Sequence, residues 1–159
     1  MPLKNKTNAM RLLDKNNIPY TVHDYTQTDA ISGMEVAAAL SENPETVFKT
    51  LVTVGKSGAY YVFLVPVNKE LDPKKAAYCV GEKSIDMVKS KELLPLTGYI
   101  HGGCSPLGMK KVFRTVLDES AARQETILFS GGKIGYQIEL RFAELEKALK
   151  FEVFPITVE

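Results

Sequence analysis

The stretch that decides the fold is TVFKTLVTVGKSGAYYVFLVPV, residues 46–67. Its outer segments, 46–54 and 59–67, are rich in β-branched and aromatic residues, and such runs favour β-strands. The connection GKSG, residues 55–58, is short and contains two glycines, which is typical of the turn of a β-hairpin. The stretch therefore predicts two paired antiparallel strands at the centre of the protein.

Helix signals lie on both sides of this hairpin. Thr7 and Ser32 stand where N-cap residues are favoured, and Glu35 follows Ser32 at the spacing of a capping box. Asp72–Pro73 is a good pair for the N-cap and first position of a helix. Helices are expected from Thr7 to Asn16–Asn17, after Ser32, at 73–80, at 89–94 ending before Pro95, and at 141–149 with Phe142, Leu145 and Leu149 on one face.

Further strand-like runs occur along the whole chain. They are IPYTVHDY (18–25), SIDMV (84–88), VFRTVLD (112–118), TILFS (126–130), YQIEL (136–140) and KFEVF (150–154). Helices and strands mix without strict alternation, which favours an α+β fold. We expect one domain over residues 1–159, with a mixed, curled, barrel-like β-sheet flanked by helices.

Composition limits the class of protein. The chain has 159 residues, 45% apolar and 25% charged, which is ordinary for a globular domain. No apolar run is long enough to cross a membrane, and the N-terminal MPLKNKTNAMRLL lacks the apolar region of a signal peptide. We therefore expect a cytoplasmic protein with reduced thiols. A net charge of +1 argues against a protein that coats nucleic acid, but allows binding of a single nucleotide.

Two glycine pairs follow strand-like segments. YIHGGCSPLGMKK (99–111) contains Gly102–Gly103, and SGGKIG (130–135) contains Gly131. Adjacent glycines let backbone N–H groups approach a ligand, but they also allow tight turns with positive φ. The second segment does not have the spacing of a P-loop. The pattern leaves both interpretations open.

Lys49 lies inside the first strand of the hairpin. Alternation places it on the face opposite Phe48 and Thr50. A lysine at that position either points to solvent or lies in a pocket that uses its charge, and the pattern does not decide between them.

The sequence predicts no metal and no cofactor. His23 and His101 are the only histidines, and neither stands in a zinc-ligand pattern. Cys104 follows His101 by three residues, which allows a cysteine–histidine catalytic pair. A free cysteine is more often a small buried apolar residue, so we favour a structural role for Cys104.

Four ordered motifs resemble the YbaK/EbsC family of aminoacyl-tRNA deacylases, which is related to the editing domain of prolyl-tRNA synthetase. The motifs are VFKTLV (47–52), LDPKKAA (71–77), TGYIHGGCSPLGMKK (97–111) and FSGGKIGYQIEL (129–140), and the match runs from about Leu12 to Leu149. The resemblance implies a hydrolase that cuts the ester between a wrong amino acid and the 3′ adenosine of a tRNA. Its best-known type removes cysteine from tRNA(Pro), in trans with prolyl-tRNA synthetase.

The resemblance also assigns site residues. The pocket lysine of the family falls on Lys49, the pocket tyrosine on Tyr25, the glycine loop on Gly102–Gly103 and the serine loop on Ser130–Gly131. It implies that Lys49 supplies positive charge, that the Gly102–Gly103 amides hold the carbonyl oxygen, and that the thiol of a cysteinyl substrate attacks its own ester. The implied partners are the acceptor end of tRNA(Pro) and prolyl-tRNA synthetase.

One position departs from the pattern of the Cys-specific type. That type has an acidic residue two positions after the last glycine of the serine loop, where this chain has Gln137. Three alternatives therefore stay open. They are a deacylase for Ala- or Ser-tRNA, a non-catalytic binder of aminoacyl or nucleotide ends, and a hydrolase that uses Cys104.

Overall fold

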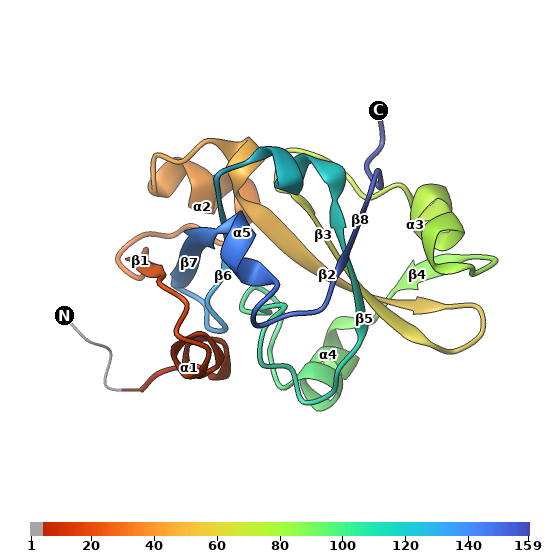
Figure 1. Ribbon diagram of the computed structural model, residues 1–159, viewed down its shortest axis with the longest axis horizontal. Helices are drawn as coiled ribbons and strands as arrows, with labels where there is room; N and C mark the ends of the chain where they lie inside the picture. The colour runs from red at the N-terminus through yellow and green to blue at the C-terminus, as the bar shows by residue number, and fades with distance from the viewer. Residues whose placement is uncertain (1–4) are drawn as a thin grey trace.

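The computed structural model describes residues 5–159 (Figure 1). The segment MPLKNKTNAMRLL, which we expect not to be a signal peptide, lies partly outside the described residues. The helices are α1 (Asn8–Lys15), α2 (Gly33–Ala39), α3 (Pro73–Val80), α4 (Ser90–Thr97) and α5 (Phe142–Leu145), with short 3₁₀ helices η1 (Pro44–Thr46) and η2 (Glu119–Arg123). The strands are β1 (Thr21–Asp24), β2 (Phe48–Gly55), β3 (Tyr60–Pro66), β4 (Ile85–Met87), β5 (Arg114–Asp118), β6 (Thr126–Ser130), β7 (Tyr136–Arg141) and β8 (Glu152–Phe154).

The strands form two sheets, not one closed sheet. A three-stranded sheet has the order β1-β7-β6, and a five-stranded sheet has the order β4-β2-β3-β5-β8. A single parallel bridge between Val47 and Leu128 joins them. The α+β class is confirmed, but the predicted barrel-like sheet is not found. The physical reason is that β2 pairs with β4 only from Thr53 to Gly55, and the chain meets β6 only at Val47, just before β2, so no continuous ladder joins the two sheets.

The predicted hairpin is confirmed and forms the centre of the large sheet. β2 pairs antiparallel with β3, with Lys49 opposite Val65 and Val52 opposite Val62. β3 is apolar on both faces because each face is covered. One hydrophobic core lies between the two sheets and includes α1, and a second lies between the large sheet and α3.

The predicted helix starts are confirmed. The Thr7 hydroxyl accepts a hydrogen bond from the Met10 N–H, and Ser32 forms a capping box with Glu35. Asp72 accepts from the first N–H groups of α3, which spans Pro73–Val80. Local capping chemistry was therefore enough to place these three helices.

Two helix predictions were wrong in extent. α4 does not end before Pro95 but continues to Thr97, because proline removes only one internal hydrogen bond and Gly98 N–H still bonds to Leu94 C=O. The helix expected at 141–149 is only Phe142–Leu145 long, and the residues that follow continue as turns. Phe142, Leu145 and Leu149 nevertheless all pack against the core, as the pattern predicted.

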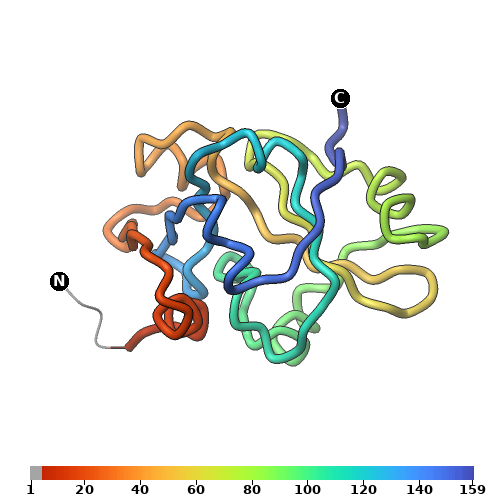
Figure 2. The backbone as a smooth tube through the Cα atoms, viewed as in Figure 1, coloured from red at the N-terminus to blue at the C-terminus, as the bar shows by residue number. Residues whose placement is uncertain are grey.

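The two glycine segments lie side by side in space, although 28 positions separate Gly103 from Gly131 in sequence (Figure 2). The Cα of Gly103 is so close to the second segment that a Cβ atom there would lie 3.0 Å from Ile134 N. Gly102 of the first segment and Ser130 of the second line one cavity together with the first residues of β2. This meeting point is the location of the candidate site.

Candidate active site

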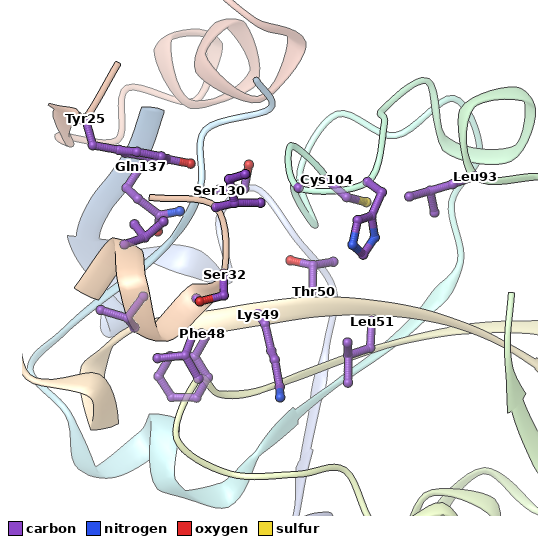
Figure 3. A pocket seen from close by; sticks show the side chains of 17 residues that line it. Tyr25, Ser32, Phe48, Lys49, Thr50, Leu51, Leu93, Cys104, Ser130 and Gln137 are labelled. Carbon is purple, nitrogen blue, oxygen red and sulfur yellow. The ribbon is translucent and has the colours of Figure 1, made fainter. Parts of the chain in front are cut away.

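A cavity of about 220 Å³ opens where β2 has no neighbouring strand (Figure 3). Residues from β2, α2, β6 and β7 line it, together with the loop after α4. Five of the predicted site residues lie on its wall: Tyr25, Lys49, Gly102, Ser130 and Gln137. Gly103 and Gly131 are buried behind the wall and do not line it. The fold thus brings residues that are far apart in the sequence to one cavity.

The HGGC loop, residues 101–104, forms one side of the cavity. Gly102 is exposed with φ +87°, and Gly103 N–H donates to Ile100 C=O over 3.0 Å to close a turn. Gly102 N–H has no hydrogen-bond partner among residues 5–159. Gly103 therefore makes the turn, and Gly102 presents a free donor beside the cavity.

The SGGK loop, residues 130–133, lies between β6 and β7 and contributes Ser130 to the cavity wall. Gly131 N–H donates to Tyr136 C=O over 2.9 Å, and Gly132 N–H donates to Ser130 Oγ over 3.1 Å. These amides are used within the hairpin. The Ser130 hydroxyl, which accepts from Gly132, still has its own proton to donate to a ligand.

Lys49 leaves β2 on the face opposite Thr50, as alternation predicted (Figure 3). Its stem lines the cavity, and its Nζ lies 3.4 Å from Glu70 Oε1. The Lys49 side chain is 28% exposed and that of Glu70 82%. An ion pair this open to solvent is weak, so the lysine is held only loosely away from the HGGC loop.

Tyr25 and Gln137 lie at the small sheet, where β1 and β7 are neighbours. Tyr25 follows β1 directly, and its N–H donates to Gly135 C=O over 2.8 Å. Tyr25 is 4% exposed and Gln137 is 7% exposed. Both line the cavity. The sequence could not establish this for Tyr25, because the register of its strand was open.

Two buried polar atoms on the cavity wall have no hydrogen-bond partner among residues 5–159. They are Gln137 Oε1 and Thr50 Oγ1. An unsatisfied buried polar atom costs about 1–3 kcal/mol, so a bound group that satisfies both is favoured. The sequence analysis did not single out Thr50. The sequence did contain an indication of Thr50. Alternation places its hydroxyl on the same strand face as Phe48 and Val52, which are both buried in the core.

Cys104 is a poor nucleophile in this position. It is 8% exposed, and burial raises the pKa of its thiol to about 12. At neutral pH the reactive thiolate form is therefore scarce. His101 is exposed at the rim of the same cavity. This burial agrees with the structural, non-catalytic role that the sequence analysis favoured for Cys104.

Among residues 5–159, one group of side chains has the composition of a metal site: His23, Glu42 and Glu139, with one ligand atom each within 4.8 Å of the others. His23 Nε2 and Glu139 Oε1 already pair with each other at 2.7 Å. None of the three lines the cavity. Glu42 joins this group only through the fold, and no sequence spacing indicated it.

Across residues 5–159, every helix is too short or too polar to cross a membrane.

Comparison with known proteins places the chain in a family. The model of the aminoacyl-tRNA editing domain matches residues 28–148. The chain belongs to the aminoacyl-tRNA editing domain family. It is thus an aminoacyl-tRNA deacylase, an enzyme that cuts the ester bond between an amino acid and its tRNA.

Individual relatives agree with this assignment. EbsC of Enterococcus faecalis, named as a candidate Cys-tRNA(Pro)/Cys-tRNA(Cys) deacylase, is 46% identical over 136 residues, which cover 85% of this chain and 83% of EbsC. A proline–tRNA ligase of Thermosipho melanesiensis is 29% identical over 102 residues, covering 64% of this chain but only 18% of the ligase. The crystal structure of a candidate trans-editing enzyme for prolyl-tRNA synthetase has the same fold, with a TM-score of 0.84 at 24% identity, covering 98% of this chain and all of that one.

Proposed function

We propose that this deacylase removes cysteine from tRNA(Pro) by cutting the ester at the 3′ adenosine. The observation that carries the proposal is the chemistry of the cavity wall. It offers donors and positive charge, while the pKa of its thiol, Cys104, is raised to about 12. A site of this kind positions a substrate that brings its own nucleophile. The 46% identity to EbsC supports cysteine as the amino acid and tRNA(Pro) as one carrier.

Cysteine can supply that nucleophile. Its sulfur attacks its own carbonyl carbon, the bond from that carbon to the 3′ oxygen breaks, and the 3′ oxygen takes the proton that the thiol gives up. The product is a cyclic thioester, which water opens to free cysteine. The rate gain comes from holding the thiol and the carbonyl in reacting geometry.

Gly102 and Lys49 are assigned to the developing charge. The free Gly102 N–H donates to the carbonyl oxygen as it becomes negative, a contact worth about 3 kcal/mol in known oxyanion holes. Gly103 supports it by closing the turn to Ile100. Lys49 releases Glu70 and turns its ammonium toward the substrate oxygen or the terminal nucleotide.

The remaining predicted residues hold the substrate. Ser130 donates its hydroxyl proton, and Gly131 fixes the hairpin that presents Ser130. Tyr25 and Gln137 close the small-sheet side of the cavity. No cofactor or metal takes part in the proposed reaction.

The tRNA contact is limited to the acceptor end. A net charge of +1 provides little general attraction for the phosphate backbone, so binding of tRNA alone is weak and salt-sensitive. Prolyl-tRNA synthetase is proposed as the partner that supplies wider recognition, supported by the match to part of a proline–tRNA ligase. Nanomolar affinity for tRNA(Pro) at physiological salt without the synthetase would contradict this.

Gln137 favours one second candidate, a deacylase for Ser- or Ala-tRNA. Its amide replaces a carboxylate, and its buried Oε1 lacks a donor among residues 5–159. A serine hydroxyl would supply that donor. Such a substrate lacks the thiol, so this activity would need a water molecule as nucleophile.

The deciding experiment compares hydrolysis of Cys-, Ser-, Ala- and Pro-tRNA(Pro) by the wild type, by Lys49→Ala and by the exposed control Lys150→Ala. We expect fast loss of cysteine only, a drop of at least tenfold in Lys49→Ala, and no change in the control. Faster loss of serine or alanine would favour the second candidate. Binding of these tRNAs without turnover would leave a non-catalytic binder, and loss of activity in Cys104→Ala would implicate the thiol.

A further inference from the structure

The register of the central hairpin decides which way each peptide group of β2 points. Val67 N–H donates to Val47 C=O over 2.8 Å, and Gly55 N–H donates to Ala59 C=O over 2.8 Å. Val47 and Gly55 therefore direct their peptide groups toward β3, and so does every second residue between them. The peptide N–H and C=O of Thr50 consequently point away from β3.

Along the part of this edge that includes Thr50, no strand forms a ladder with β2. β4 covers the edge from Thr53 to Gly55, and Val88 N–H bonds to Val52 C=O over 3.0 Å. The bridge from Val47 to Leu128 covers the other end. Between these two points, no strand ladder or bridge among residues 5–159 includes Thr50 on the side away from β3.

The cavity lies against this open edge. Five consecutive residues, Val47 to Leu51, line it. Their side chains alternate between the two faces of the sheet, so a cavity that contacts all five lies beside the backbone rather than over one face. In Figure 3, Thr50 points toward the HGGC loop and Lys49 points away from it, on either side of this edge.

We propose that the peptide group of Thr50 reads the terminal adenine, with its N–H donating to a ring nitrogen and its C=O accepting from the exocyclic amino group. This inference rests on the proposed function and names how the nucleotide end of that substrate is held. Adenine carries an N–H donor next to a nitrogen acceptor, on both its Watson–Crick and its Hoogsteen edge. Those two groups complement one outward-facing strand residue.

Hypoxanthine, the base of inosine, is the sharpest probe, because a carbonyl oxygen replaces its amino group and no donor faces the Thr50 C=O. The substrate is a cysteinyl acceptor-stem RNA that ends in adenosine, inosine or 7-deazaadenosine. We expect kcat/KM to fall at least tenfold with terminal inosine. A loss with 7-deazaadenosine assigns the Hoogsteen edge, and full activity assigns the Watson–Crick edge. Equal rates for adenosine and inosine would overturn the inference.

Two variants at Thr50 separate the backbone from the side chain. Thr50→Pro removes the outward N–H without touching the ladder to β3, which proline tolerates at a sheet edge. Thr50→Val keeps the N–H and the shape of the side chain. We expect the preference for adenosine over inosine to shrink in Thr50→Pro and to persist in Thr50→Val. If the preference instead persists in Thr50→Pro and shrinks in Thr50→Val, the Thr50 hydroxyl and not its peptide group recognises the base.

A binding measurement keeps the two proposals distinguishable. AMP and IMP are titrated into the wild type, and the amide NMR signal of Thr50 is followed. A shift with AMP that IMP does not produce supports adenine reading even if no ester is hydrolysed. If the adenosine-ended ester is hydrolysed but AMP and IMP shift the signal equally, adenine reading fails while the deacylase function stands.

Discussion

The HGGC loop and the SGGK loop have similar sequences and opposite uses of their backbone. Both contribute residues to the cavity wall, among them Gly102 and Ser130, and each contains a glycine with φ near +90°. In the SGGK loop the amides of Gly131 and Gly132 bond within the hairpin, whereas in the HGGC loop Gly102 N–H stays free among residues 5–159. A glycine pair thus serves structure where its amides are satisfied and can serve chemistry where one is left open.

The largest effect on stability is expected at the SGGK loop, in Gly132→Ala. Gly132 has φ +97°, and a Cβ there would lie 2.9 Å from Tyr99 Cε1 and 3.1 Å from Thr7 Cβ. Backbone strain and overpacking together predict a loss of about 3 kcal/mol in the free energy of unfolding. Urea unfolding measures this loss. A loss smaller than half of the predicted value would show that the SGGK loop does not need glycine at position 132 for stability.

Gly103→Ala is expected to have the next largest effect. Its Cβ would lie 3.0 Å from Ile134 N and 3.2 Å from Lys133 Cα, and both are backbone atoms. The two loops must separate, which predicts a loss of about 2 kcal/mol and a lower kcat/KM. Urea unfolding and deacylation of the preferred ester test this, and wild-type stability would show that the loops can separate freely.

Gly102→Ala sharpens the comparison within one loop. A Cβ there meets nothing closer than Ile134 Cγ1 at 3.5 Å, so only the positive φ opposes it. We expect a loss of about 1 kcal/mol in the free energy of unfolding. We also expect kcat/KM to fall by more than this loss of stability would cause, because the added side chain moves the free N–H of residue 102. Unchanged kcat/KM would remove Gly102 from the proposed chemistry.

Cys104 gives the smallest effect, visible only in the pH dependence of stability. Burial raises the pKa of its thiol from 9.0 to about 12. Because the folded pKa is the higher one, its contribution is complete below pH 9 and is lost as pH rises toward 12. The free energy of unfolding should therefore fall less steeply above pH 9 in Cys104→Ala than in the wild type. Parallel curves would show that the thiol is accessible to solvent.

The sequence by itself determined most of the elements of the fold. The apolar runs of β2 and β3 and the caps at Thr7, Ser32 and Asp72 act over a few residues, so neighbouring chemistry specifies them. Two of its errors concerned where a helix ends. The pattern could not show that α4 tolerates Pro95, nor that α5 stops at Leu145.

The sequence also identified the residues of the site but not how they are arranged. The family resemblance assigned Tyr25, Lys49, Gly102 and Ser130 and singled out Gln137, and the tertiary structure placed all five on one cavity. The direction of the Lys49 ammonium and the buried oxygen of Thr50 depend on contacts between distant segments, which no local pattern contains.

Only the tertiary structure decided that there is a cavity at all. The sequence predicted one curled sheet, but the ladder beside β2 is interrupted between Val47 and Val52. Strand pairing is a property of two segments together, so the absence of a neighbour cannot be read from one strand. In this protein the unpaired strand edge creates the site, while local residue patterns only specify which side chains surround it.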